Sequence, residues 1–496
     1  MEKRLESSNT SQAAWIALGS LFSFLFSIVS SAVLSRYLTK DAYGTYRQVM
    51  YVYTTLLSVF TLGLPLSYSF FLPRVNISEG KTLVNKLNIA FFFLGLFFSV
   101  VLFLGADLAA DILRNPKLSN CIRIFSPAPV FILPTMGLQG ILATYRKTML
   151  NTVYIVVTRV FMLLCVALPV CMLSSTVETA LWGFIVSSFI SMIVALYFNN
   201  IPFRQIKPDP THITYRQIFA YSLPLMVAGL LGVAIHAADQ FYVSRYFGQE
   251  VFADFANGSL ELPFVGMVLS ACGTVLLPVF SRMIYEETPI FRIVDLWNRT
   301  AIKAAYILYP LVVYCILFAT DIMTFLYGSQ YAISGQYFRI MLVANFFTIV
   351  QFYPIILALG KTRQYAIVHI VVFALVWIAE ALTIWIFKTP VAVTIVSVFF
   401  KIIKIILMMD IVSTSIGVKI GNLFPTHALI KTFICCLTAG IFTDFIAHQL
   451  PWNEMKLLYL VVSFVLYSLI TLLFGKWMNI DFYRVIKPIT NNIFRR

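Results

Sequence analysis

Long apolar stretches separated by short polar connections run along almost the whole chain. A helix rises about 1.5 Å per residue, so roughly 20 apolar residues cross the ~30 Å hydrocarbon core of a bilayer. This length predicts an all-α polytopic membrane protein with fourteen spanning helices. The predicted limits are 13–38, 44–72, 83–106, 120–144, 152–174, 178–198, 216–246, 252–281, 301–325, 336–358, 364–387, 390–410, 427–447 and 455–475.

The composition supports the membrane assignment. Of the 496 residues, 60% are hydrophobic and only 11% charged, whereas soluble domains carry about 25% charged residues. The seven cysteines lie mostly in apolar stretches and show no CxxC spacing, which argues against a disulfide framework or a metal site. No cofactor is expected.

The net charge of +15 is explained by topology. An even number of spans places both termini on one side of the membrane. Lysines and arginines outside the spans fall mainly on the connections that lie on the same side as the termini. Cytoplasmic loops typically carry an excess of these two residues. We therefore expect cytoplasmic termini and no nucleic-acid partner.

The chain also matches itself. Residues Ser35–Gly44 align with Ser244–Ala253 without gaps, and three shorter matches follow at nearly the same offset. The offset spans six predicted helices, so the two copies run parallel, as in transporters built from repeats. The predicted organisation is a cytoplasmic N-terminal tail, an N-lobe of helices 1–6, a cytoplasmic linker, a C-lobe of helices 7–12, two extra helices and a basic cytoplasmic tail. These segments are 1–12, 13–198, 199–215, 216–410, 427–475 and 476–496, respectively.

Four motifs resemble those of polysaccharide biosynthesis exporters in the multidrug/oligosaccharidyl-lipid/polysaccharide (MOP) superfamily. They are the SRYLTKDAYGTY run at 35–46, YSLPL at 221–225, Asp239 followed by Ser244–Tyr246, and FLYGSQY at 325–331. The resemblance is to Wzx-type flippases. It implies two MATE-like lobes around a cationic cavity, with the extra helix pair extending a groove for a lipid tail.

By this resemblance, the substrate is an undecaprenyl-pyrophosphate-linked oligosaccharide unit of the O-antigen or capsule type. Alternating access would carry it from the inner to the outer leaflet of the bacterial plasma membrane. The resemblance also implies contact with membrane lipids and glycan assembly proteins, and a monomeric protein.

Charges inside the spans are the strongest candidates for substrate contacts, because a charge at the bilayer centre costs roughly 2.5–3.5 kcal/mol unless it faces a cavity or a partner. Lys401 and Lys404 lie one turn apart in predicted helix 12, and Arg159 lies in helix 5. Each is expected to contact the pyrophosphate. The alternative is that these side chains snorkel to the interface, or that Arg159 forms a salt bridge.

Further candidates lie near the predicted outer mouth. Arg47 and Tyr51 belong to a polar face of helix 2, while Arg36 and Arg245 are related by the repeat. Helix packing is the alternative for that face, and a structural role is the alternative for Arg36 and Arg245.

Ionisable groups in helices 7, 8 and 11 are candidates for ion coupling, since intramembrane carboxylates commonly mark ion or proton relays. They are Asp239, His236, Glu261 and Glu380. Coupling to H⁺, Na⁺ or the membrane potential is compatible with this set. For Asp239, the alternative is a structural ion pair with Arg245.

Two other functions fit a polytopic chain. A membrane O-antigen polymerase or ligase would be expected to show a long outer loop and no parallel repeat. A MATE-like ion-coupled multidrug or metabolite antiporter typically has twelve helices, and acidic rather than cationic groups suit cationic drugs. The sequence favours the flippase over both.

Overall fold

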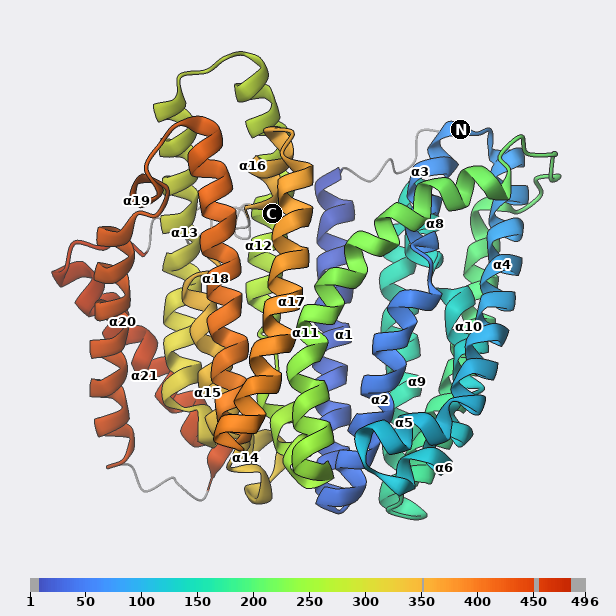
Figure 1. Cartoon of the computed structure of the whole chain (residues 1–496), viewed down its shortest axis with the longest axis horizontal. Coiled ribbons are helices and arrows are strands. Elements are labelled where there is room, and N and C mark those ends of the chain that lie inside the picture. The colour runs from blue at the N-terminus through green and yellow to red at the C-terminus, as the bar shows by residue number, and fades with distance from the viewer. Residues whose placement is uncertain (1–8, 350–351, 450–454, 483–496) are drawn as a thin grey trace. The chain divides into compact units, whose positions relative to one another are not determined.

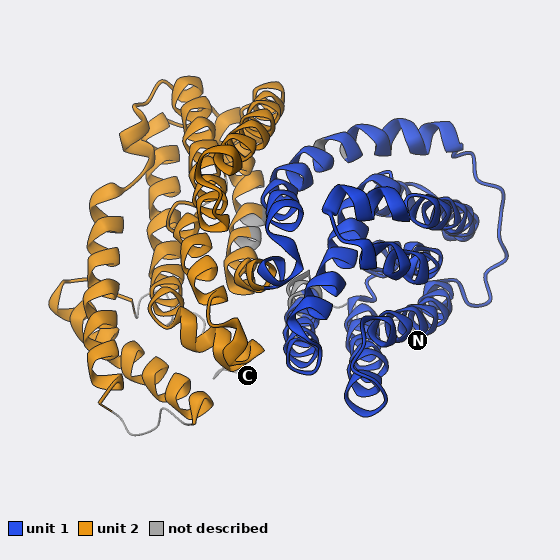
Figure 2. Ribbon diagram, turned by 60° about the horizontal axis from the view of Figure 1, so that its bottom comes forward, with its two compact units in different colours: residues 1–253 blue, residues 254–496 orange. Residues whose placement is uncertain are grey.

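The computed structural model describes residues 9–349, 352–449 and 455–482. The regular secondary structure within these residues is entirely helical (Figure 1). The chain divides into two compact units, residues 1–253 and 254–496 (Figure 2). Most of both predicted tails lies outside the described residues.

Unit 1 holds ten α-helices and most of an eleventh within the described part of the chain. They are α1 (Asn9–Tyr37), α2 (Lys40–Phe60), α3 (Leu64–Phe71), α4 (Ile77–Leu104), α5 (Ala106–Leu113), α6 (Pro116–Phe125), α7 (Ala128–Ile132), α8 (Leu138–Thr144), α9 (Thr148–Met172), α10 (Val177–Asn200) and α11 (Tyr215–Gly258).

Unit 2 continues with α12 (Pro263–Tyr285), α13 (Ile290–Leu317), α14 (Ala319–Tyr327), α15 (Ser334–Leu342), the short 3-10 helix η5 (Val343–Phe346), α16 (Tyr353–Ala358), α17 (Thr362–Phe387), α18 (Pro390–Ile416), α19 (Ile420–Leu423), α20 (Thr426–Ala447) and α21 (Lys456–Trp477).

The described residues contain ten helical segments long and apolar enough to cross a membrane, or twelve if two bent helix pairs each count as one span. All twelve coincide with predicted spans. The two other predicted spans, 252–281 and 336–358, lie on α12 and on α15 with α16, so fourteen spans remain a prediction there. The chain is a multi-pass membrane protein.

Two predicted helix limits were wrong. Helix 8 was expected over 252–281, but α11 ends at Gly258 and α12 begins only at Pro263; the non-helical Gly248, with a positive φ of 82°, lies in the predicted gap between helices 7 and 8. Proline fits the first turn of a helix because it lacks the N–H that would be unsatisfied there. In addition, α13 begins at Ile290 and not near residue 301, because polar residues extend it by three turns.

A buried polar network fixes the second half of α11 within unit 1. The Asn115 side-chain amide donates to Gln48 Oε1 at 2.6 Å, and Gln48 Nε2 donates to Ser244 Oγ at 2.8 Å. All three side chains are buried, so the bonds offset the cost of removing their polar groups from water. The network joins α2, the residue that caps the start of α6, and α11.

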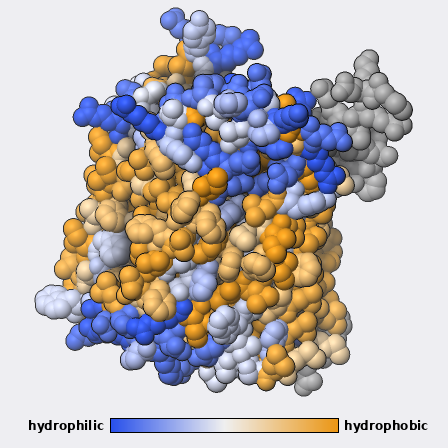
Figure 3. Space-filling view, turned by 90° about the vertical axis from the view of Figure 1, so that its right-hand side faces the viewer, coloured by the Kyte–Doolittle hydropathy of each residue, from blue (hydrophilic) through white to orange (hydrophobic). Residues whose placement is uncertain are grey.

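The lipid-facing surface is apolar. On the face drawn in Figure 3, apolar side chains form a band between two polar edges. On α4, for example, Phe93, Phe97 and Leu104 are 62%, 60% and 75% exposed, which is costly in water but favourable in hydrocarbon.

Burial follows the repeat seen in the sequence. Ser35 and Ser244 are both fully buried, and so are Tyr43 and Phe252 at their matching positions. The predicted linker 199–215 lies inside unit 1, and the lobe limits drawn from the sequence remain a prediction.

Candidate functional site

The two intramembrane lysines lie in the middle of α18. Lys401 and Lys404 are about 16 and 21 Å along a helix roughly 40 Å long. Both side chains are half-buried. Lys401 Nζ lies 3.7 Å from Met341 Sδ of α15, and Lys404 lies within electrostatic reach of Lys401. The Met341 thioether does not neutralise an ammonium group. The structure therefore brings the two positive charges of Lys401 and Lys404 together inside unit 2.

A cavity of about 290 Å³, mostly apolar but with several polar side chains in its lining, opens beside Lys404. It is bounded by α12, the segment before α16, α16, α17 and α18, all within unit 2. The residues that line it include no carboxylate; they are Leu269, Thr348, Phe352, Tyr353, Tyr365, His369, Lys404, Ile405 and Met408. We call this cavity the cationic pocket.

His369 is oriented by its own helix. Its Nδ1 donates to the carbonyl oxygen of Tyr365 at 3.0 Å, and the two rings lie 4.4 Å apart between centroids. Tyr353 packs edge-on against Tyr365. The pocket therefore combines an ammonium group, an imidazole and aromatic surface, which suits an anion with an attached ring.

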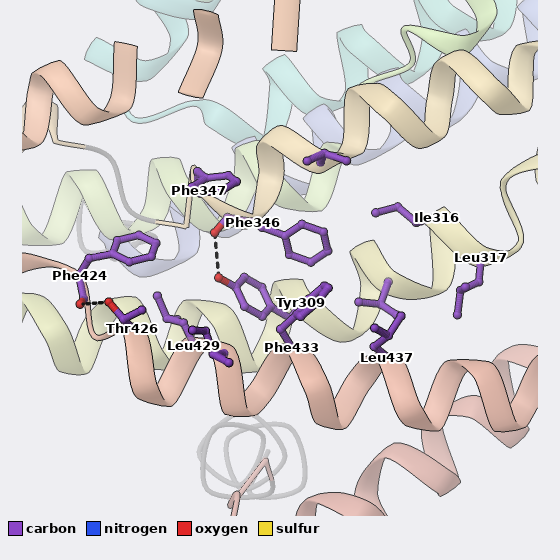
Figure 4. A pocket seen from close by; sticks show the side chains of 13 residues that line it. Tyr309, Ile316, Leu317, Phe346, Phe347, Phe424, Thr426, Leu429, Phe433 and Leu437 are labelled. Carbon is purple, nitrogen blue, oxygen red and sulfur yellow. Dashed lines mark hydrogen bonds between the residues drawn. The ribbon is translucent and has the colours of Figure 1, made fainter. Parts of the chain in front are cut away.

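A second cavity in unit 2, of about 450 Å³, is almost wholly apolar (Figure 4). It lies between α13, η5 and α20. The Tyr309 hydroxyl donates to the carbonyl oxygen of Phe346, another lining residue, at 2.8 Å. Phe433 and Leu437 contribute the α20 wall. We call it the apolar cavity, and it fits a hydrocarbon chain.

Arg159 lies deeper than its predicted helix limits implied. Because α9 begins at Thr148, Arg159 is about 16 Å from the start of a span roughly 37 Å long. Its guanidinium donates to Met162 Sδ at 3.4 Å and lies within electrostatic reach of Tyr53 and Tyr154. No carboxylate pairs with it among the described residues, so the predicted alternative of a salt bridge is not observed there.

Tyr51 and Arg245 make packing contacts in unit 1. The Tyr51 hydroxyl donates to the carbonyl oxygen of Ala237 at 3.1 Å. Arg245 donates to the carbonyl oxygen of Ile112 and lies over the Tyr246 ring, so its described contacts do not include the alternative pair with Asp239.

The other two arginines of this group differ in burial. Arg47 is half-buried beside Tyr43, and Arg36 is exposed at the end of α1. Substrate contact by Arg47 and by Arg36 therefore remains a prediction.

The predicted ion-coupling residues differ in burial. Asp239 is buried and accepts from the Gln240 backbone N–H at 2.7 Å, whereas His236 on the same helix is exposed. Glu380 is fully buried in α17. Glu261 was expected inside helix 8 but is exposed in the break before α12, and its role in ion coupling stays a prediction.

His369, Tyr365 and Thr348 were missed from the sequence. His369 is a single histidine in an apolar run without paired-ligand spacing. Tyr365 lies one turn before it, which was a usable signal because residues i and i+4 share a helix face. The contribution of Thr348 depends on tertiary packing and has no local signature.

A sequence profile of the polysaccharide biosynthesis protein family matches residues 10–284. No curated protein matches the chain by sequence.

Solved structures match over most of the chain. The lipid II flippase MurJ in an inward closed conformation has a TM-score of 0.68 at 14% identity, covering 92% of this chain and 98% of its own. An inward-facing multidrug resistance MATE family transporter of the MOP superfamily has a TM-score of 0.66 at 14% identity, with 81% and 98% covered. A MOP superfamily transporter from Pyrococcus furiosus has a TM-score of 0.57 at 15% identity, with 82% and 94% covered. These likenesses confirm the predicted all-helical, MATE-like fold.

Proposed function

We propose, because this chain belongs to the polysaccharide biosynthesis protein family, that it is a flippase for an undecaprenyl-pyrophosphate-linked oligosaccharide unit. The match to the family profile confirms the predicted family, which is one of transporters and not of enzymes. In the proposal the unit moves from the inner to the outer leaflet of the bacterial plasma membrane. Both termini are cytoplasmic, and the lobes 13–198 and 216–410 alternate access.

The observation that carries the proposal is the pair of lysines in the middle of α18. Charges there are retained where they face a cavity, and Lys404 lines a pocket without a carboxylate among its lining residues. Lysine and arginine bind phosphate oxygens through charge-assisted hydrogen bonds. We assign the pyrophosphate to Lys401 and Lys404, with Arg159, Arg47, Tyr51, Arg36 and Arg245 as further contacts along its path.

The apolar cavity supports the amphiphilic part of the proposal. It lies in the same unit as the lysines and draws its walls from α13, η5 and α20, where the extra helix pair begins. A polyprenyl chain gains about 0.8 kcal/mol per buried methylene relative to water, but little relative to lipid. The cavity therefore guides the tail and does not bind it tightly.

The membrane potential favours export of such a substrate. Moving one charge across 100 mV is worth about 2.3 kcal/mol, so a dianionic headgroup leaving a negative interior gains roughly 4–5 kcal/mol. Ion coupling through Asp239, His236, Glu261 or Glu380 would add to this drive.

A binding measurement separates the flippase from the drug antiporter, which shares the fold. We expect a diphosphate-linked sugar lipid to raise the melting temperature of the purified protein by several degrees, because ligands that bind only the folded state stabilise it. Organic drug cations should have no effect. Stabilisation by the cations and none by the diphosphate lipid would reject the proposal in favour of the antiporter.

Filling the apolar cavity tests the role given to it. Leu437→Trp is expected to slow transport of the full-length lipid several-fold, because the larger side chain would fill part of the space that guides the tail. Binding of a short-chain analogue should not change. The matched control is Ile441→Trp one turn along α20, where the side chain is 57% exposed to lipid. Equal slowing in both variants would contradict a specific role of the cavity.

A further inference from the structure

We propose that the cationic pocket binds its diphosphate together with one proton, held by His369, with Thr348 as an additional hydrogen-bond donor. This inference rests on the proposed function, because it takes the diphosphate as the occupant of the pocket. It adds two ligands that the sequence did not indicate and a proton linkage for the anion site.

The tautomer of His369 is set by its backbone contact. A carbonyl oxygen only accepts, so the ring nitrogen Nδ1 that lies 3.0 Å from Tyr365 O carries a hydrogen. The neutral ring then has a lone pair on Nε2 and cannot donate to a phosphate oxygen from that atom. Protonation converts Nε2 from an acceptor into a charged donor, which is what a phosphate oxygen needs.

The charges around the ring make its proton depend on the anion. Within the described residues of the neighbouring helices, α18 contributes Lys404, with Lys401 one turn away, and α16 contributes Tyr353. On α17 itself, the nearest carboxylate is Glu380, about 16 Å along the helix. A third positive charge beside the lysines is therefore unfavourable until an anion enters.

Thr348 supplies the independent sign of a ligand. Its hydroxyl oxygen is buried, has no hydrogen-bond partner among the described residues, and belongs to a residue that lines the pocket. A buried hydroxyl left without a partner is costly, and a phosphate oxygen in the pocket would accept from it. The Thr348 hydroxyl, the Lys404 ammonium and protonated His369 would together present donors of three kinds to the diphosphate.

The linkage is reciprocal. If the anion favours the protonated ring, then protonation favours anion binding by the same factor. One N–H bond forms at Nε2 on binding, with the proton taken from the solution on the loading side, and it breaks when the anion leaves. Affinity is then highest at low pH and falls as the pH rises through the value at which the loaded ring loses its proton.

Calorimetry on the full-length purified protein tests the linkage. The probe is a citronellyl diphosphate-linked N-acetylglucosamine, whose disubstituted phosphates do not titrate near neutrality. Titrations in two buffers of different ionisation enthalpy give the number of protons taken up per ligand. We expect uptake of up to one proton by the wild type near pH 7, and a fall in affinity of up to tenfold per pH unit above it.

Two variants and a control assign the proton. His369→Gln should abolish the uptake and the pH dependence, and weaken binding about tenfold at pH 6. Thr348→Val should weaken binding about tenfold at every pH with the uptake unchanged. The control His427→Gln replaces an exposed histidine at the start of α20 and should behave as wild type.

The outcomes separate the inference from the function it rests on. Wild-type binding without proton uptake, or the same uptake in His369→Gln, would overturn the inference and leave the flippase intact. Failure of the wild type to bind the probe at all would overturn both. Because the wild-type measurement alone can reject the linkage, the test does not depend on how well a variant folds.

Discussion

Replacing both Lys401 and Lys404 with alanine is expected to lower flipping of the lipid-linked oligosaccharide at least about a hundredfold, with normal abundance in the membrane. A hydrogen bond to a charged group is worth roughly 1.5–3 kcal/mol, so two such contacts contribute about 3–6 kcal/mol. The loss should not unfold the protein, because neither lysine pairs with a carboxylate in the described residues and alanine removes a costly charge. The measurement is the rate of flipping in vesicles at equal protein content.

Lys388→Ala is the matched control. Lys388 is exposed between α17 and α18, so its loss removes the same charge from the same pair of helices outside the pocket. We expect a rate within about twofold of the wild type. Full activity of the double variant would instead assign both lysines to snorkelling at the membrane interface.

Gly183→Ala is expected to destabilise unit 1 strongly. A Cβ at this position of α10 would lie 2.0 Å from the backbone oxygen of Cys165 and 3.0 Å from Val166 Cα in α9. Overpacking typically costs 1–3 kcal/mol, and contact with backbone allows little relief, so we expect about 3 kcal/mol. In a unit of this size that lowers the melting temperature by roughly 6–12 °C. Thermal unfolding of the purified protein measures it.

Gly232→Ala provides the opposite outcome with the same substitution. A Cβ at Gly232 of α11 would meet no atom within 4 Å. Alanine also has the higher helix propensity, so stability should be unchanged or rise by up to about 1 kcal/mol. If the Gly183→Ala variant had the same melting temperature as the Gly232→Ala variant, the close approach of α9 and α10 would be wrong.

The helices were predictable because hydrocarbon imposes a simple requirement. A spanning segment must satisfy its backbone internally and present apolar side chains, so length and apolarity identify it. The same rule fails where a helix leaves the bilayer or breaks. The polar first turns of α13 and the break that holds Glu261 illustrate both failures, since neither is encoded by apolarity.

The candidate site was predictable only in part. Lys401, Lys404 and Arg159 were identifiable because the membrane makes their charges expensive, which is a property of each residue alone. The contributions of His369 and Thr348 arise from the packing of α16, α17 and α18 around one cavity. Likewise, the network of Asn115, Gln48 and Ser244 joins residues far apart in sequence, so no spacing rule indicates it.

The most direct test of the proposed function is flipping by the purified wild-type protein in sealed vesicles. Vesicles carrying the lipid-linked oligosaccharide in both leaflets are treated with an external glycan hydrolase, and the fraction of protected glycan is measured over time. The proposal predicts cleavage approaching completion with the protein, and about half protected in protein-free vesicles or with the double lysine variant. Continued protection of half of every glycan tested, together with exchange of drug cations for protons, would contradict it.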